Sequence, residues 1–451
     1  MTRTYVLPKR PAPGVAFVSL ALFLACLWVA GGASRADVFG QVVVRAVAWI
    51  ILIVTVLVGT GPHDRGSRPV LYLLLGAIAL VILQLIPLPP DWWGSLSGRD
   101  AFAPVRDLTG AAAWRPMAIV PSAAENAIGA LVVPLAAYFL IIRAGPSTNG
   151  GLVATLLGLV VATALVGLVQ LAGVPLENPL VNASREASGT FANRNHFALF
   201  LAIGCLLAPV WALHGRTRLS WRVFAAAGLI PLFLLMILAS GSRAGIGVGA
   251  VALAGGGTMA WLPIQRMMRD RPRWIIPAVM IGFMLLMLML GLLSYDADRA
   301  TSVQRAMTAS VDIDMRRRGL PVVLAMIREY FPFGAGFGGF DALFRLHEPD
   351  SLLKPTYFNR AHNDFLEIVL DGGVAGAALI ISGAGWWLWR SIIAWRSVAS
   401  DMLSRLGSLM ILLIGLASVF DYPARTPMIM ATLVIAGIWL GQRRDVAGDR
   451  L

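Results

Sequence analysis

His362 lies in a polar run, residues 359–364, directly before an apolar stretch of the chain. An asparagine at 359 or 363 is suited to cap the helix that begins there. A cap at this point places His362 near the positive end of the helix dipole, which favours a neutral imidazole able to accept a proton. The alternative interpretation is a polar helix start with no chemical role.

Arg243 lies in the run 240–245, which joins two apolar segments with almost no loop. An arginine at a membrane boundary is costly unless it reaches water or has a partner. Its guanidinium is permanently charged and forks onto phosphate oxygens, so the position predicts either a phosphate contact or a simple membrane anchor. A run of three arginines ends in Arg317 and Arg318, and adjacent residues cannot share one helical face. On charge alone the run predicts a solvated basic patch attracted to anionic headgroups, with at least one arginine turned toward the membrane surface.

A third polar cluster opens an apolar run from residue 195 and contains Asn193, Asn195 and His196. Asparagine and glycine in such a position suit a tight turn and a helix cap, and this structural role is the favoured interpretation. Both cysteines lie inside apolar runs, and no zinc-protease, paired-cysteine, phosphate-loop or nucleophile-elbow motif occurs. The sequence therefore predicts no metal site and no cofactor.

The composition of the chain indicates which class of protein carries these candidate residues. Of the 451 residues, 58% are hydrophobic and only 14% are charged, whereas a soluble domain carries about 25% charged residues. A soluble multi-domain enzyme and a disordered chain are therefore excluded. The net charge of +13 comes mostly from arginines between apolar runs, which argues against nucleic acid as a partner and for contact with a lipid bilayer.

The apolar runs predict an all-α polytopic membrane protein with about 12 transmembrane helices, since each crossing needs roughly 20 apolar residues. The predicted spans are 14–34, 39–59, 69–88, 123–142, 151–172, 195–213, 221–240, 243–263, 274–294, 364–390, 404–420 and 424–441.

A large, partly helical loop separates the ninth and tenth predicted spans. Four regions follow: 1–122 with spans 1–3 and a first outer loop, 123–294 with spans 4–9, 295–363 as the large loop, and 364–451 with spans 10–12 and a tail. Basic residues are more numerous in the short loops on one side, which predicts that both termini are cytoplasmic and both long loops lie outside.

Four short motifs occur in order along the chain. They are Gly-Thr-Phe-Ala-Asn-Arg-Asn-His-Phe-Ala at 189–198, Ser-Arg-Ala-Gly at 242–245, Arg317 ahead of Pro-Phe-Gly-Ala-Gly at 332–336, and His-Asn-Asp-Phe-Leu at 362–366 followed by Gly372-Gly373. In this order and spacing they resemble the motifs of the O-antigen ligase and polymerase superfamily of bacterial inner-membrane proteins. The resemblance covers roughly residues 150–440.

The resemblance implies a metal-independent glycosyltransferase that takes a preassembled glycan from undecaprenyl diphosphate at the periplasmic face. It implies that Arg243 and Arg317, with Arg318 as a close alternative, hold the donor diphosphate. It further implies that His362 acts on the acceptor hydroxyl, with Asn193, Asn195, His196 and Asn363 in support. Arg360 is not part of the family pattern and adds either a third diphosphate contact or a headgroup contact. Direct attack by the acceptor inverts the anomeric centre.

The acceptor is left open between lipid A-core, a lipid-linked repeat unit and, as a distant third, a protein. Ligation to lipid A-core is the first choice, and polymerisation of lipid-linked repeat units for O-antigen or exopolysaccharide is the alternative. A non-catalytic transporter of polysaccharide or lipid-linked sugar is the alternative from another class. Transporters place polar groups near the bilayer midplane, whereas the polar clusters here lie at the outer ends of the spans, so an enzyme is favoured.

Overall fold

The structure is a computed structural model that describes residues 13–59, 65–102, 104, 113–174, 176–181, 187–214, 220–267, 269, 317–353, 358–397 and 401–442. The predicted span 274–294, Arg316 and the first part of the predicted large loop lie outside these residues. Both ends of the chain lie outside them as well.

The described residues are almost entirely α-helical, and nine of their helical segments are long and apolar enough to cross a membrane. Seven of the nine are single helices: α2 (Phe39–Val58), α3 (Arg68–Leu85), α9 (Arg194–Leu213), α10 (Trp221–Ala239), α11 (Arg243–Met267), α15 (Asp364–Arg396) and α16 (Met402–Phe420). The other two combine α6 (Pro121–Ala130) with α7 (Val132–Ala144), and the 3-10 turn Pro146–Thr148 with α8 (Asn149–Leu171). Shorter apolar helices are α1 (Pro13–Ala30) and α17 (Pro427–Gly441). The all-α polytopic class is confirmed, and a helix stands at every predicted span within the described residues.

Helix α9 forms the centre of the bundle. Nearly all of its side chains are buried, because α8, α10, α11 and α16 pack around it. Its first turn is capped by Asn193, whose side-chain oxygen accepts the backbone N–H of Asn195 at 2.8 Å. The predicted cap at this polar cluster is therefore present.

Helix α15 is capped by Asn363, whose side-chain oxygen accepts the backbone N–H of Leu366 at 3.0 Å. The helix is kinked at Gly373, which has φ 56° and ψ −139°. At the kink, the carbonyl of Pro332 accepts the backbone N–H of Val374 at 2.9 Å. The large loop thus contacts α15 backbone to backbone, and a glycine is needed because any side chain at 373 would overlap Pro332.

The described part of the large loop packs around a small apolar core. It contains a helix over residues 317–330, α14 (Phe340–His347) and the 3-10 turn Asp350–Leu352. Its buried core residues are Val323, Met326, Tyr330, Ala335, Phe340, Leu343, Phe344, Leu352 and Phe358, and Leu370 of α15 packs into the same core. An apolar core of this kind lets the segment hold a fixed shape outside the helix bundle.

The first long loop forms a two-stranded antiparallel sheet of β1 (Pro87–Leu88) and β2 (Arg115–Pro116), with α4 (Pro90–Gly94) and the 3-10 turn Asp100–Phe102 beside it. The buried guanidinium of Arg99 joins this loop to the large one. It donates to the carbonyl of Met117 at 2.7 Å and to that of Gly334 at 3.3 Å. Burial lowers the pKa of Arg99 to about 10, but the residue stays charged at neutral pH and holds the two loops together.

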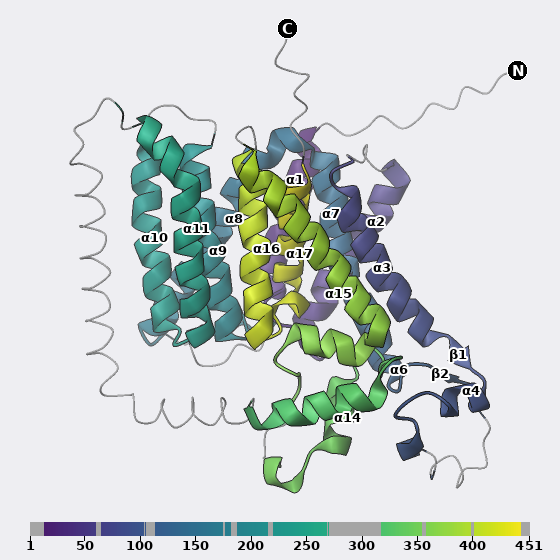
Figure 1. The fold of residues 1–451 in the computed structure, drawn as a ribbon. Helices are drawn as coiled ribbons and strands as arrows, with labels where there is room; N and C mark the ends of the chain where they lie inside the picture. Colours follow the sequence, from purple (N-terminus) through teal and green to yellow (C-terminus); the bar gives the residue numbers. More distant parts are fainter. Residues whose placement is uncertain are drawn as a thin grey trace, which may run out of the picture.

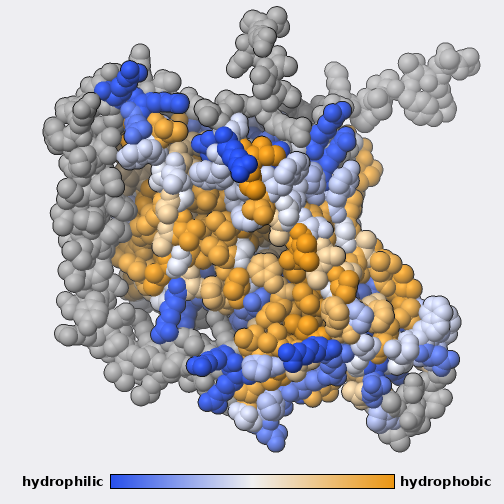
Figure 2. All heavy atoms as spheres, viewed as in Figure 1, coloured by the Kyte–Doolittle hydropathy of each residue, from blue (hydrophilic) through white to orange (hydrophobic). Residues whose placement is uncertain are grey.

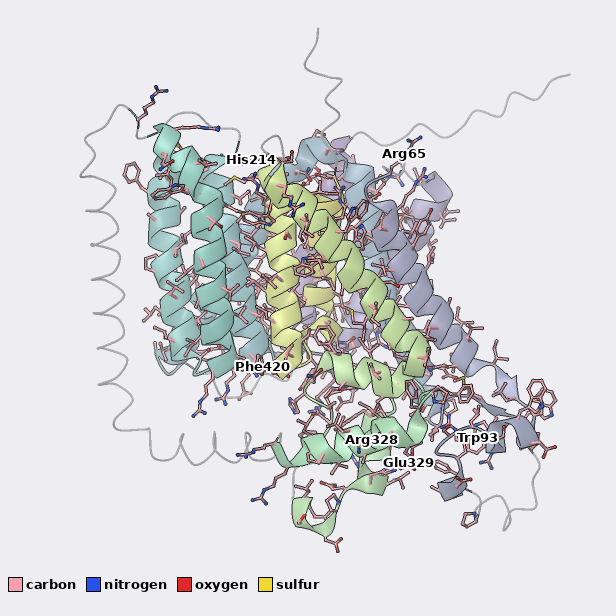
Figure 3. The ribbon with its side chains drawn as sticks, viewed as in Figure 1. Arg65, Trp93, His214, Arg328, Glu329 and Phe420 are labelled. Atoms are coloured by element: carbon pink, nitrogen blue, oxygen red, sulfur yellow. The ribbon has the colours of Figure 1, made fainter. Side chains whose placement is uncertain are left out.

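The two loops gather at one end of the helix bundle, where α4, β1, β2 and α14 lie (Figure 1). We call this end the loop side. Figure 3 labels Trp93, Arg328, Glu329 and Phe420 at the loop side, and Arg65 and His214 at the opposite end. Hydrophobic residues cover much of the surface between the two ends, and hydrophilic residues gather at the ends (Figure 2). This distribution is the one expected of a protein that spans a bilayer.

The kink in α15 gives a stability prediction. Gly373→Ala forces a side chain into a positive-φ position and against the Pro332 carbonyl, so it should destabilise the fold by at least about 1–3 kcal/mol. Gly385→Ala on the same helix is the matched control, because a Cβ there meets no other atom within 4 Å. Thermal unfolding of the purified protein in detergent checks both. Equal melting temperatures for the two variants would show that position 373 does not require a glycine.

Candidate active site

Asp421 directly follows α16 on the loop side and is almost completely buried. Its carboxylate accepts hydrogen bonds from the amides of Asn193, at 2.9 Å, and Asn195. The Nδ1 atom of His362 lies 3.3 Å away, and the backbone N–H of Tyr422 donates at 3.0 Å. A buried carboxylate is stable only when donors replace the water it has lost, and here the donors come from two of the motifs found in the sequence.

The motif at 242–245 joins the same network through Ser242. Its hydroxyl donates to the side-chain oxygen of Asn195 at 2.7 Å and accepts the backbone N–H of Gly245 at 2.9 Å. Ser242 therefore caps α11 and also ties that helix to α9. A continuous path of hydrogen bonds runs from Ser242 through Asn195 and Asp421 to His362.

His362 is held in a restricted conformation. Its backbone has φ 51°, which costs a residue other than glycine about 1–2 kcal/mol. Its ring packs between Phe358 and Tyr422, with both centroid distances at 5.1 Å. A proton on Nδ1, shared with Asp421, leaves the lone pair of Nε2 available. Nε2 makes no hydrogen bond within the described residues, so it can accept a proton from a substrate.

The remaining predicted supporting residues mainly shape the site. His196 is buried in the first turn of α9, with Nδ1 3.0 Å from the hydroxyl of Thr426 and its ring edge-on to Tyr422. Asn363 caps α15 and donates to the carbonyl of Val419 at 3.0 Å. His196 connects α9 to the turn after α16, and Asn363 connects the start of α15 to the end of α16.

The predicted diphosphate ligands are exposed on the loop side of the chain. Arg243 is the first residue of α11 and directly follows Ser242, so it stands next to the hydrogen-bonded path. It forms no ion pair within the described residues. Arg317 and Arg318 are exposed at the start of the helix over 317–330. All three side chains are accessible to a ligand that approaches from solvent or from the headgroup layer.

A buried ion cluster lies next to the His362–Asp421 pair. Arg425, in the 3-10 turn Pro423–Arg425, contacts three carboxylates of α15: Asp364 at 3.3 Å, Glu367 at 3.2 Å and Asp371 at 3.6 Å. Burial lowers the pKa of Arg425, but the three carboxylates raise it by more, so the net shift is upward and the guanidinium stays charged. The cluster fixes the α16–α17 turn against α15.

Glu367 extends this cluster to the segment before His362. Its carboxylate accepts the guanidinium of Arg360 at 3.0 Å and the backbone N–H of Ala361 at 2.9 Å. Arg360 is therefore engaged in an ion pair. Together these bonds help to hold His362 in its unfavourable backbone conformation.

The motif reading missed Asp421, Arg425 and the carboxylates of α15. A signal existed for the carboxylates, since positions 364, 367 and 371 recur at helical spacing on one face of a predicted span. Acidic residues inside a span are costly unless paired, which marks them for attention. Asp421 carried a weaker signal, as an acidic residue at the outer end of the eleventh span.

Comparison with known proteins finds a family similarity in one segment of the chain. Residues 228–381 match the family model described as O-antigen ligase. This segment of the chain is therefore similar to the O-antigen ligase/polymerase superfamily. A search of curated proteins finds no match. The O-antigen ligase match confirms the resemblance seen in the motifs and indicates a membrane enzyme of the glycosyltransferase type.

The segment that matches the O-antigen ligase model contains Arg243, Arg317, Arg318 and His362. Asn193 and Asn195 precede the segment, and Asp421 follows it. The hydrogen-bonded path therefore joins the matched segment to helices on either side of it in sequence.

The ion cluster gives a second stability prediction. Arg425→Gln leaves three buried carboxylates short of a positive charge and should destabilise the protein by about 3–5 kcal/mol. The matched control is Arg345→Gln, which removes an exposed pair with Asp341 and should change stability by about 0.5 kcal/mol at most. Thermal unfolding in detergent measures both. A small loss for Arg425→Gln would contradict the role given to the cluster.

Proposed function

We propose that this protein transfers a preassembled glycan from undecaprenyl diphosphate to a sugar hydroxyl at the periplasmic face of the bacterial inner membrane. The loop side is the periplasmic side in this proposal, and both termini are cytoplasmic. The preferred acceptor is lipid A-core, which makes the reaction O-antigen ligation. The observation that carries the proposal is the His362–Asp421 pair, placed at the loop side of a membrane-spanning bundle.

In the proposed reaction, the Nε2 atom of His362 removes the proton of the acceptor hydroxyl. The hydroxyl oxygen attacks the anomeric carbon of the first sugar, and the bond from that carbon to the diphosphate oxygen breaks. The stereochemistry inverts because the attack is direct. Asp421 holds the imidazole and stabilises the positive charge that develops on it.

The leaving diphosphate gains negative charge as the bond breaks. Guanidinium groups can stabilise it by paired hydrogen bonds. Arg243 is suited to this because it is exposed and next to the network, and Arg317 or Arg318 can approach from the large loop. The carboxylates of α15 are buried and paired with Arg425 and Arg360, which argues against their use as a nucleophile in a double displacement.

The test is complementation of a strain that lacks the gene, together with transfer assays on the purified protein. His362→Ala should lower the transfer rate by about 10²–10⁴-fold, the usual contribution of a general base. Asp421→Asn should also lower the transfer rate strongly, because the amide no longer fixes the tautomer of the His362 imidazole that acts as the base. His347→Ala is the matched control, because this loop-side histidine pairs with Glu329 and lies outside the network.

Gel analysis of lipopolysaccharide and of carrier-linked glycan separates the acceptors. Long carrier-linked chains with no capped lipopolysaccharide in the inactive variants identify a ligase. Single repeat units on the carrier identify a polymerase. Normal glycans in His362→Ala and Asp421→Asn would overturn the enzymatic proposal and favour a transporter.

A further inference from the structure

Arg45, an arginine inside the membrane-spanning part of the protein, takes no part in the site described above. It lies in α2 and is only partly buried. Its guanidinium donates to the side-chain oxygen of Asn126 on α6 at 2.7 Å and to that of Gln41 at 3.2 Å. Its Nε atom is buried and has no hydrogen-bond partner. Every partner is neutral, so the guanidinium charge is not compensated.

No carboxylate within the described residues supplies the missing charge. Glu125 precedes Asn126 in sequence, but it is exposed and makes no ion pair with Arg45. The contrast with Arg425 is clear, since that guanidinium contacts three carboxylates. A permanently charged group in a membrane span is costly unless a partner or the headgroup layer compensates it. Arg45 therefore calls for an anionic partner that is not part of the protein.

The position of Arg45 indicates where that partner comes from. Gln41 precedes Arg45 by one helical turn, so the arginine side chain runs back toward the start of α2. On α6, Ala123 precedes Asn126 by one turn and contacts Gly338 of the large loop. The guanidinium thus lies in the part of α2 nearest the loop side, where the headgroup of a lipid can approach it.

We propose that Arg45 and Asn126 form a binding site for the phosphate of a membrane lipid headgroup. The guanidinium retains an unused Nε donor, and the amide nitrogen of Asn126 makes no hydrogen bond within the described residues. These groups fit phosphate oxygens, which accept several charge-assisted bonds at once. The lipid is either an ordinary anionic phospholipid or the lipid carrier. The site uses none of the Asp421 network and does not depend on the proposed reaction.

Native mass spectrometry of the purified full-length protein in a neutral detergent tests the site. Phosphatidylglycerol is the probe, and diacylglycerol is the phosphate-free control lipid. Arg45→Gln should weaken phosphatidylglycerol binding by about tenfold, the value of one charge-assisted hydrogen bond. Arg35→Gln is the matched control variant, because this nearby arginine already pairs with Asp37. It should bind phosphatidylglycerol as the wild type does.

A second variant changes the charge of the site without changing the size of the side chain. Asn126→Asp replaces the amide with a carboxylate of the same size, 2.7 Å from the guanidinium in the present geometry. The new internal ion pair should raise the melting temperature and displace the phosphate lipid, also by about tenfold or more. This outcome does not depend on whether Arg45→Gln folds.

Competition with undecaprenyl diphosphate distinguishes the two lipid sources. Displacement of phosphatidylglycerol at equal or lower concentration identifies the carrier, and a lack of displacement identifies an ordinary phospholipid. Wild-type phosphatidylglycerol binding in both Arg45→Gln and Asn126→Asp would overturn the proposal. Equal wild-type binding of diacylglycerol and phosphatidylglycerol would overturn it as well. The assay measures no glycan transfer, so its result is independent of the reaction proposed above.

Discussion

The hydrogen bonds to the buried carboxylate of Asp421 set the arrangement of the loop side. A carboxylate removed from water needs donors in fixed positions, and Asp421 receives them from Asn193, Asn195, His362 and its own following peptide. These donors belong to the starts of α9 and α15 and to the turn after α16. Ser242 adds the start of α11 through Asn195. The positions of four helix ends therefore follow from the need to satisfy one charge.

The charges on α15 link this arrangement to the loops. Arg425 neutralises part of the charge of the three buried carboxylates and fixes the turn that follows Asp421. At the far end of the cluster, the carboxylate of Asp371 accepts the backbone N–H of Gly338, and its backbone carbonyl accepts that of Gly336, both in the large loop. Arg99 then connects that loop to the first one. The chemistry of His362 thus depends on a scaffold that extends from the bundle into both loops.

Sequence patterns revealed the parts of the protein that depend on local physics. Apolar runs predicted the spans, and Asn193 and Asn363 stand where caps were expected, because span length and helix capping are decided within a few residues. Asp421 could not be found in this way, since its partners lie up to 228 residues away in the chain. The carboxylates of α15 were visible at helical spacing, but their pairing with Arg425 required the packing of α15 against the turn after α16.

The path from Ser242 to Asp421 also has a consequence for how the protein is made. A ribosome produces the chain from the N-terminus, so α9, α11 and α15 are synthesised before residue 421 exists. Until the hairpin of α16 and α17 is inserted, His362 has no carboxylate beside its Nδ1 atom, and Asn193 and Asn195 have no common acceptor. A partly synthesised chain already embedded in the bilayer therefore lacks an ordered reactive centre. The arrangement of His362 and Asp421 can form only late in biogenesis, when that hairpin is inserted.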